Sequence, residues 1–213
     1  MRITIPESTS EILLGDYQKY VSSVNESDDE DFRKSKMIQL FCGVSFSDVE
    51  KMPLTDRDEM VEILNKAFTA KRKSFKHYKR FTLDGVEFGF IPDLERIKVK
   101  ENTDITIYLG DNENLHKLMA VMYRPITEST RDLYSIEDYN GSDRYSDVMR
   151  NAPLDLVLEA SVFFWHLMRS LLNAIRQSTD KEVMKVVDLV RKRHLQQPGV
   201  GIHPFMQLQE EIY

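Results

Sequence analysis

The amino-acid sequence predicts a mainly helical α+β protein with a small antiparallel β-hairpin element and an extended C-terminal tail. Three observations lead to this fold class. Apolar side chains recur every three or four residues over most of the chain, which is the spacing of amphipathic helices. Residues 81–90 instead alternate polar and apolar side chains around Asp84 and Gly85. Residues 196–213 contain two prolines and two glycines, so they cannot form a continuous helix.

The first 70 residues are expected to form one short strand followed by three or four helices. Residues 2–5 alternate polar and apolar side chains until Pro6, which ends the strand. Helix boundaries are expected at the N-capping residues 8–10, at the C-cap Gly43 and at the capping-box pattern that starts with Ser47. A further helix is expected from Thr55. Its apolar face is predicted to carry Met60, Ile63, Leu64, Ala67 and Phe68.

The clearest β signal surrounds the dipeptide Asp84-Gly85. This is a two-residue loop favoured in type I′ turns, where both residues have positive φ. The flanking residues 81–83 and 86–90 are therefore predicted to pair as a hairpin, and residues 103–109 are expected to add a further strand. The β region then spans residues 81–109 within a single domain of residues 1–195, with 196–213 as the tail.

The second half of the chain is expected to hold a helix, a long loop and the strongest helix of the protein. Asp111 caps the first of these, which ends before Pro125. Residues 127–149 are polar and rich in tyrosine and turn-forming residues, and their length favours a binding loop or a segment ordered by a partner. The strongest helix follows Pro153, and its apolar stripe is wide enough to be buried on several sides.

Charge and cysteine content exclude several classes of protein. The formal net charge is −6, so nucleic-acid binding through bulk charge is not expected. The single cysteine, Cys42, excludes an intrachain disulfide and favours synthesis in a reducing compartment. Its place in the apolar run 37–42 predicts a buried, unreactive thiol. The sequence shows neither a secretory signal nor a membrane-spanning stretch, which predicts a soluble protein of the cytoplasm.

The sequence contains no complete catalytic or metal-binding pattern. The five histidines include no His-x-x-x-His pair. Glu113 and His116 have the spacing used in di-iron bundles but lack the second such pair, so a surface or capping role is expected for His116. Gly199 and Gly201 lack the third glycine and the flanking strand and helix of a dinucleotide loop. We therefore expect a non-enzymatic protein with no catalytic residues, no metal and no cofactor; a hydrolase is the enzymatic alternative.

Two kinds of binding segment are candidates. Residues 71–80 interleave cations with aromatic side chains, a pattern that can bind phosphates and stack on bases. The candidate polyanion-binding residues are Lys71, Arg72, Lys73, Lys76, Lys79 and Arg80. The alternative interpretation is a solvated face that neutralises the acidic residues 25–31.

Candidate partner-binding residues come from the aromatic helix, the tyrosine-rich loop and the tail. They are Phe163, Phe164, Trp165, Tyr134, Tyr139, Tyr145 and Phe205.

Several segments in order resemble one family. They are IPES at 5–8, IQLFCGV at 38–44, VEKM at 49–52, residues 58–64, GFIPDL at 89–94, HKLMAVMYRPI at 116–126, APLD at 152–155 and VFF at 162–164. They resemble small proteins from the structural gene modules of tailed bacteriophages, including phages of gut Bacteroidetes such as the crAss-like group. Members of that class are described as tail-assembly-chaperone-like or as uncharacterised virion proteins. The resemblance covers roughly residues 1–170.

This resemblance implies a non-enzymatic bacteriophage virion or morphogenesis protein that binds other virion proteins. It implies either a ring, connector or packaged component of the particle, or a tail-assembly chaperone that leaves it. The implied partners are other virion proteins and further copies of this chain, in the host cytoplasm during assembly and in the virion for a packaged component. The resemblance implies no catalytic residues. The alternative function is nucleic-acid contact through the basic residues 71–80.

Overall fold

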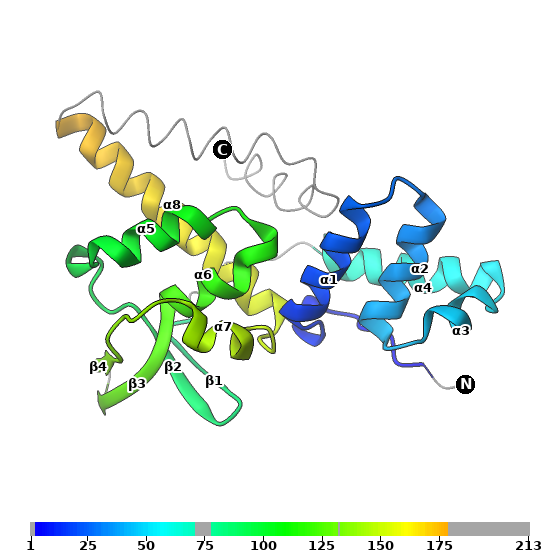
Figure 1. Cartoon of the computed structure of the whole chain (residues 1–213), viewed down its shortest axis with the longest axis horizontal. Helices are drawn as coiled ribbons and strands as arrows, with labels where there is room; N and C mark the ends of the chain where they lie inside the picture. The colour runs from blue at the N-terminus through cyan, green and yellow to red at the C-terminus, as the bar shows by residue number, and fades with distance from the viewer. Residues whose placement is uncertain (1–2, 71–77, 132, 179–213) are drawn as a thin grey trace. The chain divides into compact units, whose positions relative to one another are not determined.

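The computed structural model describes residues 3–70, 78–131 and 133–178. In these residues, helices and one four-stranded antiparallel sheet form a mainly helical α+β protein, which confirms the predicted fold class (Figure 1). They divide into two compact units. The first comprises residues 3–70 and Pro153–Asp155, and the second comprises residues 78–152 and 156–178. The predicted tail, residues 196–213, lies outside the described residues.

The first unit is built from four α-helices. They are α1 (Leu14–Asn25), α2 (Glu30–Cys42), α3 (Phe46–Glu50) and α4 (Leu54–Thr69), preceded by a 3₁₀ turn at Thr9–Glu11. Gly43 ends α2 with a φ of 65°, as its C-capping role predicts. The third helix is capped by Ser45 rather than Ser47. The Ser45 hydroxyl accepts from the Asp48 amide at 3.2 Å and donates to the Asp48 carboxylate at 2.6 Å.

Helix α2 packs against both α1 and α4 in the first unit (Figure 1). Leu14, Ile38 and Leu64, one from each of these helices, are fully buried. The Phe41 ring lies between those of Tyr20 and Phe68, at centroid distances of 5.2 and 5.5 Å. The predicted strand at residues 2–5 is wrong for the described residues 3–5, which belong to no strand. Local alternation is not sufficient, because an extended segment also needs a neighbouring strand to pair its backbone groups.

The second unit combines the sheet with the remaining helices. Its strands are β1 (Arg80–Leu83), β2 (Val86–Phe90), β3 (Tyr123–Thr130) and β4 (Leu133–Ile136), in the order β1-β2-β3-β4. Its helices are α5 (Val99–Tyr108), α6 (Leu115–Met122) and α7 (Asp143–Met149). Helix α8 (Leu154–Ser178) follows Pro153 as predicted, and all but its first two residues belong to this unit. No helix in the described part of the chain is long and apolar enough to cross a membrane.

The predicted hairpin at residues 81–90 is confirmed. Asp84 and Gly85 have φ values of 49° and 79°, the two positive angles that a type I′ turn requires. The register pairs Leu83 with Val86 and Arg80 with Gly89.

The predicted strand at residues 103–109 is wrong, because these residues lie largely in α5. Their β-branched side chains favour a strand, but Thr103 and Thr106 donate to the carbonyls of Val99 and Asn102, four residues earlier. Ile105 is fully buried on the inner face of the helix. Packing of Ile105 into the core therefore outweighs the local β propensity.

The predicted long loop at residues 127–149 is also wrong. It contains the second half of β3, all of β4 and all of α7. Alternate residues of β4 are exposed. Residues 127–130 of β3 are all exposed, so the polar composition that favoured a loop is that of a largely solvent-exposed hairpin. Arg131, with a φ of 53°, lies in the turn of this hairpin.

One face of the sheet carries the aromatic core of the second unit. Phe88 and Phe90 of β2 and Tyr123 of β3 are buried. Phe81 stacks on Phe88 at 5.7 Å, and Phe163 of α8 meets Phe90 edge-on at 5.6 Å. These contacts attach α8 to the sheet, and Val157 and Val162 of its predicted apolar stripe are buried.

On the opposite side of β2, Gly89 allows the ring of Tyr134 to lie directly against the backbone. A Cβ atom at Gly89 would be 2.5 Å from Cε2 of Tyr134 and 3.0 Å from Cγ1 of Ile126. The Tyr134 hydroxyl is 2.8 Å from the Phe90 carbonyl oxygen and 3.1 Å from that of Lys79. Glycine at this position thus lets β4 pack closely on β2.

We predict that Gly89→Ala destabilises the protein by about 2 kcal/mol, because the added methyl overlaps the Tyr134 ring. Urea denaturation followed by circular dichroism measures the change. The same substitution in a Tyr134→Ala background should cost distinctly less, since the colliding ring is absent. Equal costs in the two backgrounds would show that the Tyr134 ring is not what requires glycine.

Candidate functional site

Helix α5 is held on the sheet by a buried ion pair. Arg124, on β3, places Nη1 2.5 Å from Oε1 of Glu101, in the first turn of α5. Both side chains are buried. Removing either partner leaves an uncompensated charge in a poorly solvated place, so the pair constrains where α5 begins. The Arg124 Nε has no hydrogen-bond partner among the described residues.

Glu101 also fixes the start of α5. Its second oxygen, Oε2, accepts a hydrogen bond from the backbone amide of Lys98 at 2.8 Å. This amide precedes the helix and would otherwise lack a partner within it. Lys98 in turn pairs with Asp138 at 2.9 Å. One buried carboxylate therefore joins the first turn of α5 to β3.

Tyr139 extends this network to the segment after β4. Its ring lies against the Arg124 guanidinium, with Cζ 5.5 Å from the ring centroid. Its hydroxyl donates to Oδ2 of Asp104, in the middle of α5, at 2.5 Å. Burial and the neighbouring Asp104 carboxylate both raise the pKa of Tyr139, which keeps the phenol protonated. Tyr139 is thus a second anchor for α5.

With its inner side fixed in this way, α5 presents apolar side chains to solvent. Val99 is 85% exposed and Ile107 is 47% exposed, and Thr103 lies between them, also exposed. The three residues are four apart and share one side of the helix; we call them the α5 outer face. An apolar side chain as exposed as Val99 contributes almost no burial free energy to folding, and its surface is available for contact with a partner.

The predicted aromatic binding surface on α8 is largely internal. Phe164 is buried in the core and Phe163 packs edge-on against Phe90, so both rings are engaged within the fold. Trp165 is half-buried, meets His166 edge-on and lies under the Arg169 guanidinium at 5.2 Å. Of the apolar stripe of this helix, Leu154, Val157 and Val162 are buried within the fold.

The three candidate tyrosines also have internal roles. Tyr134 packs on Gly89, and Tyr139, which is buried, anchors α5. Tyr145 of α7 packs edge-on against Phe88 and donates to Oε2 of Glu137 at 2.5 Å. Each of the three hydroxyls therefore has a partner within the fold.

The basic residues 71–80 are described only at their C-terminal end. Arg80 donates to the Ser129 hydroxyl at 2.8 Å and stacks on the Tyr134 ring at 4.7 Å, so its guanidinium is engaged within the fold. Lys79 is exposed. Four of the candidate cations, Lys71, Arg72, Lys73 and Lys76, lie outside the described residues, as does Phe205.

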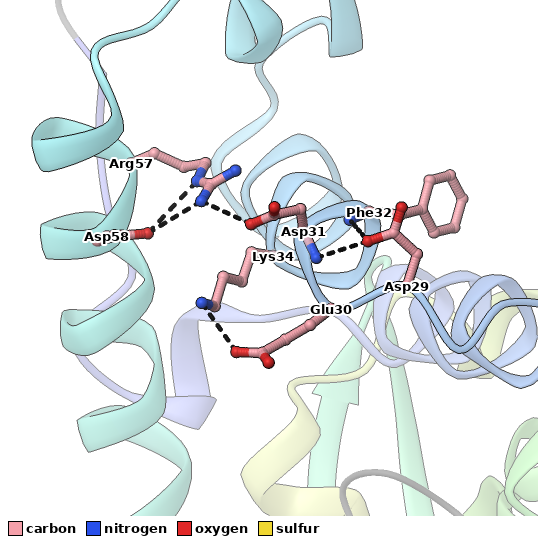
Figure 2. Close-up of polar contacts among 7 residues, drawn as sticks. All are labelled: Asp29, Glu30, Asp31, Phe32, Lys34, Arg57 and Asp58. Atoms are coloured by element: carbon pink, nitrogen blue, oxygen red, sulfur yellow. Dashed lines mark hydrogen bonds and ion pairs between the residues drawn. The ribbon is translucent and has the colours of Figure 1, made fainter.

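The acidic residues at the start of α2 have cationic partners from α2 and α4. Figure 2 shows Asp29 capping the backbone amides of Asp31 and Phe32. Arg57 of α4 lies 2.8 Å from Asp31, and Lys34 lies 2.9 Å from Glu30 (Figure 2). These contacts are exposed and contribute little stability. The segment is a capped helix start with neighbouring counter-charges.

Two residues singled out by their chemistry are fixed in environments that limit reactivity. Cys42 is half-buried, and burial raises the pKa of its thiol to about 11, which disfavours the nucleophilic thiolate. His116 is 3% exposed, so the expected surface role is wrong. No group of three His, Cys, Asp or Glu side chains within the described ranges is placed to hold a metal ion.

None of the protein-family models, curated proteins or solved structures with which the chain was compared matches it.

The α5 outer face was not predicted from the sequence. The signal that identifies it is the four-residue spacing of Val99, Thr103 and Ile107, which fits one side of a helix. The β-branched run within residues 103–109 favoured a strand and concealed this spacing.

We predict that Glu101→Gln destabilises the protein by about 3 kcal/mol, because Arg124 then keeps a buried charge without a counter-charge. Glutamine retains an oxygen that can accept the Lys98 amide, so the change isolates the ion pair. Adding Arg124→Met should restore at least half of the loss in urea denaturation. If Glu101→Gln alone left stability unchanged, the pair would not anchor α5.

Proposed function

We propose that this chain is a non-enzymatic protein that binds other proteins during the assembly of a tailed bacteriophage, and that α5 is its principal contact. The single observation that carries the binding role is the exposure of Val99 and Ile107 on a helix whose other side is fixed by buried polar contacts. A rigid helix with an apolar outer face can enter a partner's groove without losing much conformational freedom.

The internal use of the polar side chains supports a non-enzymatic role. Arg124, Glu101, Tyr139 and Tyr134 each satisfy a structural contact within the fold. A catalytic group needs to reach a substrate with its donor or acceptor atom, and these atoms are directed at neighbouring residues instead.

The resemblance of the sequence segments supports the phage assignment. The two forms of the proposal differ in whether the protein remains in the finished virion. As a ring, connector or packaged component, the protein remains in the virion. As a tail-assembly chaperone, it binds a virion protein in the host cytoplasm and then departs. Contact with nucleic acid through residues 71–80 has less support, because Arg80 is committed to Ser129 and Tyr134.

Measurements on purified particles and on infected cells distinguish a virion component from a chaperone. Mass spectrometry of virions from the phage that encodes this chain should detect it in stoichiometric amounts if it is a component. If it is a chaperone, it should be absent from virions but should co-purify from infected cells with an identified structural protein of that phage. Absence from virions together with failure to capture any structural protein would contradict the proposal.

We predict that the double substitution Val99→Ser and Ile107→Ser weakens binding to the captured virion protein by about tenfold or more, corresponding to roughly 1.4 kcal/mol. Both side chains are exposed, so the fold should be retained. Leu54→Ser is the matched control, because Leu54 is also exposed and apolar but lies in the first unit. Isothermal titration calorimetry measures the affinities. Equal affinities for wild type and the double variant would remove α5 from the interface.

A further inference from the structure

A buried histidine and an arginine meet where α6 packs against α7 (Figure 1). His116 is the second residue of α6, and Arg150 directly follows α7. Nε2 of the imidazole lies 2.9 Å from Nη2 of the guanidinium. The His116 side chain is almost completely buried, whereas Arg150 is half-buried. The contact therefore joins the start of one helix to the end of the next.

This contact requires a neutral imidazole. A guanidinium can only donate hydrogen bonds, so Nε2 must act as the acceptor and the ring proton must be on Nδ1. The ring also forms a hydrogen bond with the backbone of Glu113, in the turn that precedes α6. Both ring nitrogens are thus engaged when the imidazole is uncharged.

The groups around the ring favour the neutral form. Burial, followed by the positive charges of Arg150 and Lys117, lowers the pKa of His116 to about 4, while Asp147 and the Glu113 backbone act in the opposite direction. Arg150 and Asp147 come from α7 and its C-terminal cap, and Lys117 comes from α6 itself. Asp147 lies 3.5 Å from Nε of Arg150, so its charge is shared with that guanidinium.

We propose that His116 and Arg150 form an acid-sensitive link between α6 and α7, which breaks when a proton from solvent binds Nε2. Protonation removes the only acceptor that the ring offers to Arg150. It also places two cations in contact at a site with little water. Separation of α7 from α6 relieves both effects.

Release of α7 would uncover apolar surface. Met149, at the end of α7, is fully buried, and Tyr145 packs edge-on against the buried Phe88. Opening of α7 would leave Met149 and Phe88 without these covers. The link therefore connects a proton-binding event to the exposure of apolar side chains, which is a change that a partner or a dye can detect.

The direction of the pH dependence follows from the shift. We call the state with α7 packed on α6 closed and the state with α7 released open. The pKa of His116 in the closed state is lower than the ordinary value of 6.5, so the open state binds protons more readily. The link stabilises the closed state fully at pH values above 6.5, and this stabilisation is lost as the pH falls towards 4. The equilibrium constant for opening is expected to rise roughly 20-fold between pH 7 and pH 5.

Hydrogen–deuterium exchange of the full chain, corrected for the intrinsic pH dependence of amide exchange, tests this proposal. Protection of residues 143–149 should fall between pH 7 and pH 5 while protection of β2 and β3 persists. In His116→Gln the side chain still offers an oxygen acceptor and an amide donor but does not titrate, so this loss should be absent. His166→Gln is the matched control and should behave like wild type.

A second measurement protects the test against a variant that fails to fold. The ring resonances of His116 in the wild-type protein should titrate with a midpoint below that of a free histidine. A midpoint at or above the ordinary value would overturn the proposal. An unchanged acid response in a folded His116→Gln variant would overturn it as well, as would uniform loss of protection across the sheet.

Discussion

The buried ion pair between Glu101 and Arg124 is the interaction on which the proposed role of this protein depends. It places one charge of each sign away from water, each beside the other. Such a pair adds little net stability compared with apolar side chains of the same size, but each partner strongly restricts the position of the other. Its main effect is therefore to define the position of α5.

Several features of the second unit follow from that constraint. Tyr139 can anchor Asp104 only if α5 begins at the position that Glu101 defines. Ile105 then faces the core, and Val99 and Ile107 face solvent. The apolar outer face is thus the consequence of polar contacts on the inner face. A helix held only by apolar packing would have more freedom to rotate and to bury these side chains.

The elements that could be predicted from the sequence are those with a local cause. Gly43 ends a helix and Asp84-Gly85 forms a turn because the backbone angles needed there suit only a few residue types. The aromatic stripe of α8 is similarly visible from its own spacing. Residues 103–109 and 127–149 could not be predicted correctly because their structure is decided by distant partners. The helix at 103–109 depends on Arg124 and the sheet, and β4 depends on the contact of Tyr134 with Gly89.

In the candidate site, too, features with a local cause could be predicted and features decided by distant partners could not. Phe163 and Phe164 were candidate contacts because of the wide apolar stripe of their helix, and the tyrosines because of the predicted loop. An aromatic side chain fills a core as well as an interface, and only packing decides between the two. The buried ion pair between Arg124 and Glu101 joins residues that are far apart in sequence, so no local sequence pattern predicts it.

The most direct test of the central claim is a hydrogen-exchange footprint of this chain bound to a structural protein of its phage. We predict that amide protection increases across residues 99–107 in the complex and that β1 and β2 change little. Protection that appears elsewhere on the chain, with residues 99–107 exchanging as in the free protein, would contradict it.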